Sequence, residues 1–251
     1  MARHAPNHRT PSAAAKDVLA QLRTVSDPEV AARGRSYFKE ADDITLLGVK
    51  APQTRALAGA IHARVKHTWG PSEAVHFCEL LAQRPEFEAK MVGVLVLSRF
   101  HRVFPRSLVS TVRKWIVAGW FCNWAAIDGL CAVTTPLVRR YPDLLPRVTR
   151  WAGSPVVWLR RAAVVTLVPL ARRGERLDET YAVVEALLDD DEDLMHKACG
   201  WLLREAGKTD RARLEKFLLR HKAAIPRTTV RYAIERFPEK RRHKLLVATR
   251  G

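Results

Sequence analysis

The chain has little of what builds a membrane, secreted or metal-binding protein. Its 251 residues include only 12 glycines and 4 cysteines, and no apolar run approaches the roughly 18 residues of a membrane span. The opening segment, MARHAPNHRTPSAAAKD, lacks the apolar stretch of a secretory signal. The cysteines form no CxxC pair, so we expect buried thiols in a reducing compartment and no zinc site.

Strand patterns and the common catalytic motifs are also missing. Apolar and polar residues never alternate for long at period two, whereas the i, i+3, i+4 spacing of helices recurs along the chain. No phosphate-binding P-loop, GxGxxG, HExxH or GxSxG motif is present. The sequence therefore predicts an all-α protein whose chemistry, if it has any, does not depend on these motifs.

Acidic residues are few for the number of basic ones. Lys and Arg total 43 against 26 Asp and Glu, which gives a formal net charge of +17 and a pI near 10.4. Such an excess repels itself in the folded chain unless a polyanion neutralises it. Nucleic acid is the usual partner at this pI, and a basic protein without such a partner is the alternative.

Proline marks the starts of the expected helices. A proline at the first helical position costs no hydrogen bond, and Asp27 and Ser154 each precede one as natural N-caps. The prolines near the start of an apolar-periodic segment are Pro28, Pro52, Pro71, Pro85, Pro105, Pro142, Pro155, Pro226 and Pro238.

Similar helical segments recur with a period in the thirties. They are FEAKMVGVLVLSRF (87–100), NWAAIDGLCAVTTPLV (123–138), VWLRRAAVVTLVPLAR (157–172), LMHKACGWLLREAGK (194–208) and TVRYAIERF (229–237). A two-helix repeat of this length is typical of an α-solenoid, in which each pair buries its apolar face on its neighbours. We expect an all-α, curved α-solenoid of about six antiparallel helix pairs. Coincidence among amphipathic helices is the alternative.

A cation stands at the equivalent point of four repeats: Lys90, Arg161, Lys197 and Arg231. The later steps between them are 36 and 34 residues, and the first step, of 71, spans two periods. Stacking the repeats would place one cation per repeat along a concave face, as a groove for a phosphate backbone requires. A solvated charged face without a ligand is the competing interpretation.

Three tryptophans lie on the helices that carry these cations: Trp124, Trp158 and Trp201. Asp128 follows Trp124 by four residues, so both side chains share one helical face. A carboxylate in the apolar stretch FCNWAAIDGLCAV is costly unless it is paired or used. Aromatic rings with a carboxylate suit a cationic ligand, whereas core tryptophans and an Asp128–Arg pair are the structural alternative.

The segments NWAAIDGL, SPVVWLRRAA and HKACGWLLREAGKT, in this order and spacing, resemble the AlkD-like DNA glycosylases of the DNA alkylation repair family. SYFK (36–39) and LLGVKAPQTRAL (46–57) are also similar to that family, and the resemblance runs from about residue 15 to 240. It implies a superhelix of HEAT-like repeats and a monofunctional enzyme without metal or organic cofactor. The implied reaction is hydrolysis of the N-glycosidic bond of N3- and N7-alkylated purines in double-stranded DNA, with the lesion left stacked.

The resemblance also implies roles for particular residues. Trp124 and Asp128 match the active-site Trp and Asp of the family, Trp201 matches its second aromatic residue, and Arg161 matches a DNA-contacting Arg. Tyr37 matches an aromatic residue that lines the groove.

Two further positions complete this comparison. Arg204, one turn beyond Trp201, is expected to touch phosphate. Asn123 stands where the family often has an aromatic residue, which predicts a wider or rewired edge of the lesion site. The predicted DNA-binding set comprises Arg161, Arg204, Lys90, Lys197, Arg231, Tyr37 and Trp158.

We expect a basic N-terminal arm over residues 1–14, one domain over residues 15–247 and a tail over residues 248–251. The protein is expected to be a monomer in a bacterial cytoplasm, bound to the nucleoid through DNA and not to membranes. Three alternatives stay open: a non-catalytic DNA-binding solenoid, a glycosylase specialised for bulky natural-product adducts, and a scaffold whose basic face meets an acidic protein.

Overall fold

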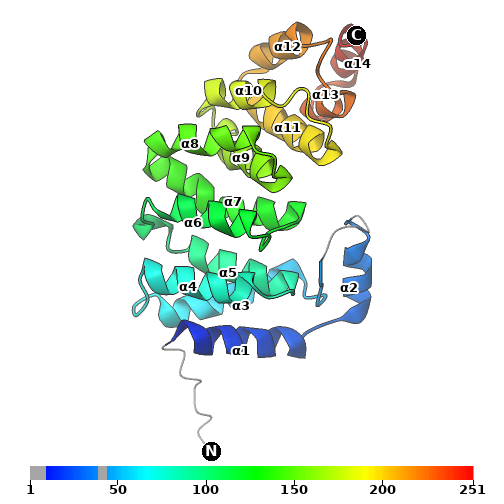
Figure 1. Cartoon of the computed structure of the whole chain (residues 1–251). Coiled ribbons are helices and arrows are strands. Elements are labelled where there is room, and N and C mark those ends of the chain that lie inside the picture. The colour runs from blue at the N-terminus through cyan, green and yellow to red at the C-terminus, as the bar shows by residue number, and fades with distance from the viewer. Residues whose placement is uncertain (1–9, 39–43, 251) are drawn as a thin grey trace, which may run out of the picture. The chain divides into compact units, whose positions relative to one another are not determined.

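The computed structural model describes residues 10–38 and 44–250. This part of the chain consists of helices joined by turns and loops, with one isolated bridge between Thr45 and Glu86 (Figure 1). It divides into two compact units, residues 1–137 and 138–251. The all-α, solenoid-like fold predicted from the sequence is confirmed by these stacked helices. Most of the expected arm lies outside the described residues, and the first helix already begins at Pro11 behind its N-cap, Thr10.

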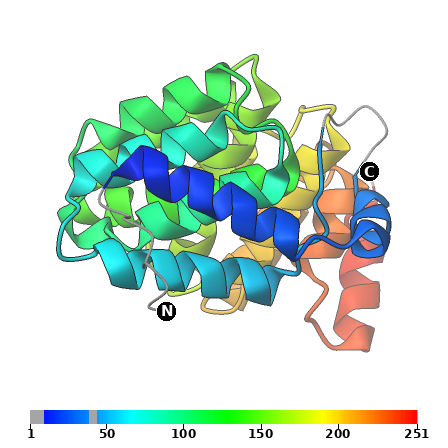
Figure 2. The same cartoon turned by 90° about the horizontal axis from the view of Figure 1, so that it is seen from below.

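The first unit is a stack of helices in which α5 is central. Its α-helices are α1 (Pro11–Thr24), α2 (Pro28–Arg35), α3 (Ala51–Val65), α4 (Pro71–Ala82), α5 (Phe87–Ser98), α6 (Leu108–Val117) and most of α7 (Trp124–Arg140), with a 3₁₀ turn η1 (His101–Val103). α5 packs on α3 and α4, and α1, dark blue in Figure 2, packs on α4 and α5. α5 is therefore buried on several sides, which explains why its sequence is apolar almost all round.

The second unit shows the repeat most clearly. Its elements are η2 (Pro142–Leu144), α8 (Leu145–Thr149), η3 (Arg150–Gly153), α9 (Val157–Ala171), α10 (Leu177–Glu185), α11 (Asp193–Ala206), α12 (Arg211–Arg220), α13 (Arg227–Ala233) and α14 (Glu239–Ala248). α9 packs on α11, and α11 packs on α13. Gly200 permits the second contact, because a Cβ there would lie 2.4 Å from the Cβ of Tyr232. The expected stacking of equivalent helices is thus present in this unit.

The helix boundaries follow local chemistry, with one exception. Asp27 caps α2 by accepting hydrogen bonds from the N–H groups of Glu29 and Val30, as the sequence predicted. The prediction for Ser154 is wrong: α9 begins only at Val157, because the Ser154 hydroxyl accepts the N–H of Val156 in the turn before the helix.

The cysteines are mainly core residues. Cys78, Cys131 and Cys199 are buried and Cys122 is partly buried. Burial raises the pKa of the Cys199 thiol to about 12, with the charge of Asp190 adding to the effect. This thiol is therefore protonated and inert at neutral pH.

Candidate active site

Trp124 and Asp128 lie at the start of α7, one helical turn apart, and both side chains are partly exposed. Asn123, only 3% exposed, holds this end of the helix. Its Oδ1 accepts the N–H of Ala126 at 2.9 Å, and its carbonyl accepts the N–H of Ile127. Asn123 is therefore the N-cap of α7, and its side chain points into the helix start. Its effect on the edge of a lesion site stays a prediction.

We expect Asn123→Ala to lower the free energy of unfolding by about 1 kcal/mol, because the N–H of Ala126 loses its acceptor. Asn123→Ser retains a cap acceptor and should recover most of this loss. Urea unfolding of the three proteins measures the difference. Equal losses for Ala and Ser would contradict the capping role.

Trp124 belongs to an aromatic cluster built by segments far apart in the sequence. Its ring stacks on Phe38 with a centroid distance of 5.5 Å and an interplanar angle of 24°, and Phe38 meets Phe87 edge-on. The Trp124 Nε1 donates to the carbonyl oxygen of Tyr37 at 3.4 Å. Tyr37, another expected site residue, is 76% exposed and so offers its ring to solvent beside Trp124.

A cavity of about 370 Å³ lies beneath this cluster, between α2, residues 46–55, α5 and Trp124. Its walls are mainly apolar, and they include Val30, Leu46, Phe87, Met91 and Leu95, with Arg55 and Glu88 as the charged members. On the Met91 side, the absence of a side chain at Gly129 lets α7 come close to α5: a Cβ on Gly129 would lie 2.2 Å from Met91 Cε. The first half of α7 thus packs against α5, which forms one wall of the cavity.

Glu88 fixes the loop that borders this cavity. Its carboxylate is buried and accepts the backbone N–H groups of Leu47, Gly48 and Val49 at 2.8–3.2 Å. Gly48 has a φ of 78°, and a Cβ there would lie 2.0 Å from the carbonyl oxygen of Asp27. Glu88 therefore ties α5 to the loop against which α2 begins, and α2 leads directly to Tyr37 and Phe38.

Sequence reasoning missed three residues of this site: Phe38, Asn123 as a cap, and Glu88. Phe38 lies next to Tyr37 in the quoted SYFK motif, and its partner Trp124 is 86 positions away. Like Asp128, Glu88 is a carboxylate within an apolar helical segment, which is unfavourable unless the carboxylate is paired or used. What that carboxylate binds could not be read from the sequence, because its partners are backbone groups of a distant loop.

Lys90 is used within the first unit. Its Nζ donates to the carbonyl oxygens of Ala82 at 2.6 Å and Trp120 at 2.9 Å. Ala82 is the last residue of α4, so the ammonium group stabilises the negative end of that helix. The structure thus gives Lys90 a role in the fold, and DNA binding by this residue stays a prediction.

In the second unit, α9, α11 and α13 carry the remaining candidate residues. Trp158 and Trp201 are partly exposed, in contrast to the buried core residues Trp115 and Trp151. Arg161 is only 5% exposed, and its guanidinium donates to the carbonyl oxygen of Leu194 at 2.9 Å. The packing of α9 on α11 is therefore stabilised in part by Arg161.

Lys197 and Arg231 differ in their surroundings. The hydrogen bond of Lys197 to Asp193, at 2.7 Å, raises the pKa of the lysine, while the nearby Arg161 charge opposes this shift. Arg231 is exposed on α13 and has no ion pair with any residue in the described parts of the chain. The four cations in register thus have different environments, and Arg231 is the most available to a ligand.

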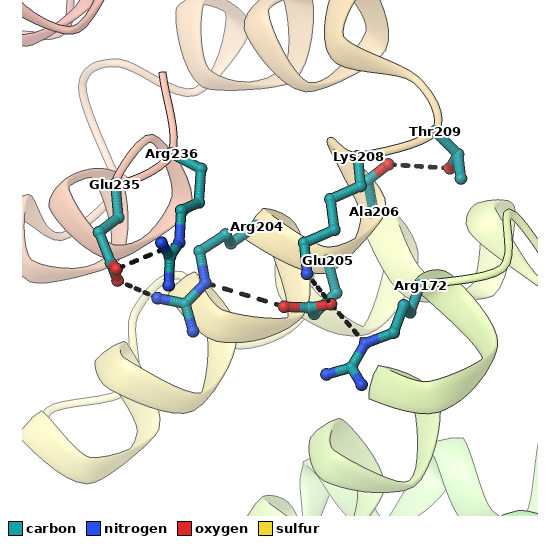
Figure 3. A network of polar contacts seen from close by, with 8 residues as sticks. All are labelled: Arg172, Arg204, Glu205, Ala206, Lys208, Thr209, Glu235 and Arg236. Atoms are coloured by element: carbon teal, nitrogen blue, oxygen red, sulfur yellow. Dashed lines mark hydrogen bonds and ion pairs between the residues drawn. The ribbon is translucent and has the colours of Figure 1, made fainter. Parts of the chain in front are cut away.

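Arg204 lies in a network of charges at the end of α11 (Figure 3). It forms an ion pair with Glu235 and lies 3.9 Å from the buried Glu205, which also binds Arg172 and Lys208 at 2.6 Å each. Burial alone would raise the pKa of Glu205, but the hydrogen bonds from Lys208 and Arg172 outweigh it and hold this pKa below its usual range. The network orients Arg204 and leaves it partly exposed.

Among the residues that the structure describes, no three His, Cys, Asp or Glu side chains lie together in a way that would hold a metal ion. Within residues 10–38 and 44–250, none of the helices has the length and apolarity to cross a membrane.

Comparison with known proteins gives one family and one fold. The family model of the DNA alkylation repair enzymes matches residues 18–237. A solved structure from Enterococcus faecalis, described as a predicted DNA alkylation repair enzyme, superposes with a TM-score of 0.74 over 85% of this chain and 97% of that one. At 20% sequence identity, this likeness concerns the fold alone. No curated protein sequence matches this chain.

Proposed function

Because the chain belongs to the DNA alkylation repair enzyme family, we propose that it is a monofunctional DNA glycosylase of base excision repair. Its proposed substrates are cationic N3- and N7-alkylated purines in duplex DNA. The observation that carries this proposal is the pair Trp124 and Asp128, one turn apart at the capped start of α7. Both are partly exposed, as contact with a substrate requires.

The proposed chemistry follows from the charge of the lesion. N3- or N7-alkylation makes the purine cationic, so the base leaves as a neutral molecule with the electron pair of the N-glycosidic bond. Positive charge then develops on the deoxyribose as an oxocarbenium-like species. Asp128 stabilises that charge and positions the water that adds to the anomeric carbon, and the water's surplus proton passes to the carboxylate and then to solvent.

The aromatic residues complete the proposed site. Trp124 and Trp201 flank the deoxyribose, and their electron-rich faces favour the developing cation by about 0.5–2 kcal/mol each. No base flipping is required, because the bond that breaks is at the sugar and the lesion can stay stacked. The stacking of Trp124 on Phe38 supports this role, since it holds the tryptophan in one orientation.

DNA binding is proposed to be electrostatic and indifferent to sequence. The net charge of +17 supports it, and the proposed contacts to the phosphate backbone and groove come from a set of cations and aromatic residues. This set comprises Arg161, Arg204, Lys90, Lys197, Arg231, Tyr37 and Trp158. The protein acts as a monomer in the bacterial cytoplasm, where undamaged DNA is the main competitor for these contacts.

A base-release assay on duplex DNA containing N7-methylguanine tests the proposed function. We expect the purified protein to release the free base and to leave an abasic site without cutting the strand. Tight binding of the duplex without base release would instead identify a non-catalytic DNA-binding protein. Binding of an acidic polypeptide in preference to DNA would identify a scaffold.

The apolar cavity supports a second candidate, a glycosylase specialised for bulky adducts. A space of about 370 Å³ beside Trp124 exceeds what a methyl group needs. Single-turnover rates on N7-methylguanine and on a bulky N3-adenine adduct separate the two candidates. A clear preference for the bulky lesion would favour the second.

A further inference from the structure

The last helix, α14, carries a dense group of exposed cations. The family match ends at residue 237, so α14 (Glu239–Ala248) lies beyond it. One acidic residue, Glu239, is followed by five exposed basic side chains: Lys240, Arg241, Arg242, His243 and Lys244. None of the residues used in the proposed glycosylase reaction lies on this helix.

These cations are unfavourable for the helix itself. They occupy its first half, where the helix dipole favours acidic side chains. Lys240 and Lys244 are one turn apart, a spacing at which like charges destabilise an isolated helix. A helix of 10 residues is also too short to be stable alone in water. Its persistence therefore depends on contacts with the rest of the second unit.

Arg227 provides the main polar anchor. Its guanidinium donates to the carbonyl oxygens of Leu246 and Thr249 and to the Thr249 hydroxyl, at 2.9–3.1 Å. Leu245 and Thr249, one turn apart, are buried on the same side of the helix. The helix is thus fixed through its C-terminal half, and the basic half is held toward solvent.

Only one cation of the group has an ion-pair partner among the described residues. Arg241 pairs with Glu215 of α12 and so belongs to the anchor. Lys240, Arg242 and Lys244 are exposed and form no ion pair with any residue in the described ranges. No acidic side chain of the described residues therefore compensates their charges.

We propose that α14 is an accessory DNA-binding element whose Lys240 and Lys244, which share the helix face opposite the buried Leu245 and Thr249, contact the phosphate backbone of duplex DNA. A bound polyanion offsets the mutual repulsion of the cations on α14, and DNA is the polyanion that enzymes of this family encounter. Lys240 and Lys244 are about 6 Å apart along the helix axis. That distance spans about two phosphates of one strand. The inference rests on the proposed DNA-binding function, and not on base excision.

The test compares two double variants that lose the same charge. The first is Lys240→Gln and Lys244→Gln on α14. The control is Lys216→Gln and Arg220→Gln, two exposed cations that are likewise one turn apart, on α12. Neither variant alters Arg227, Leu245 or Thr249, so α14 should stay docked, which circular dichroism and thermal unfolding verify.

Equilibrium binding to an undamaged duplex is measured between ~50 and ~200 mM salt. For the α14 variant we expect the slope of log K against log salt to fall by about 0.9 for each lost phosphate contact, with affinity near 0.1 M salt reduced roughly tenfold or more. The control variant should change affinity less than twofold. Equal changes in both variants, or none in the α14 variant, would overturn the proposal.

Single-turnover base release at saturating protein separates this proposal from the glycosylase proposal. The α14 variant should release base at the wild-type rate once bound, because it retains Asp128, Trp124 and Trp201. If the wild type releases no base while the α14 variant still lowers the salt slope, the glycosylase proposal is wrong and the proposal for α14 is supported. A slower chemical step in the α14 variant at saturation would contradict a role confined to binding.

Discussion

The Asp128→Asn protein should excise N7-alkylguanine about 10²–10³-fold more slowly than the wild type, the loss expected for one preorganised electrostatic group. Asparagine retains the size and polarity of the side chain and removes only the charge that the oxocarbenium-like sugar requires. Binding to undamaged duplex should hardly change, because a carboxylate contributes no attraction to phosphate. Single-turnover base release and equilibrium binding measure the two effects.

Glu29→Gln is the matched control for Asp128→Asn. Glu29 is exposed on α2, so the control changes the net charge equally without touching α7. Thermal unfolding of both proteins should give melting temperatures close to that of the wild type. If Asp128→Asn instead lowers the free energy of unfolding by about 3–5 kcal/mol while the folded fraction retains full activity, Asp128 is a structural ion-pair partner.

The periodic features of the fold could be predicted from the sequence, because they depend on local chemistry. The steps of 36 and 34 residues between Arg161, Lys197 and Arg231 match the packing of α9, α11 and α13. Proline and Asp27 marked helix starts for the same reason. The prediction of Ser154 as a helix cap was wrong, because a hydroxyl that caps a turn and one that caps a helix have the same sequence signature.

The environment of each cation could not be predicted in this way. Register places Lys90 and Arg161 at equivalent points, and both prove to donate to backbone carbonyl oxygens. Every residue has such a carbonyl, so nothing in the sequence shows which one a cation will reach. Register therefore identifies a helix face, whereas the number of charges that remain for DNA depends on packing.

Contacts between distant segments limited the prediction of the candidate site more strongly. The pair Trp124 and Asp128 is local, and its spacing alone places both side chains on one face of α7. The stacking of Trp124 on Phe38 depends on how α2 is held, and that depends on the loop bound by Glu88. The proposed reacting group could therefore be predicted more readily than the contacts that orient it.

Glu88→Ala tests that dependence, and we expect it to lower the free energy of unfolding by about 3 kcal/mol or more, because two buried N–H groups and the partly buried N–H of Leu47 lose their acceptor. Glu88→Gln retains one oxygen for the N–H groups of Gly48 and Val49, so its loss should be clearly smaller. Urea unfolding of the three proteins measures these free energies, with Glu29→Ala on the exposed face of α2 as the neutral control.

Amide hydrogen exchange distinguishes a local role of Glu88 from general destabilisation. In Glu88→Ala, the N–H groups of residues 47–49 should exchange faster under conditions where the amides of α9 stay protected. Base release should also slow in the folded protein, since Phe38 no longer holds Trp124 in place. Uniform loss of protection in both units, with normal base release by the folded fraction, would show that Glu88 stabilises the fold without positioning the site.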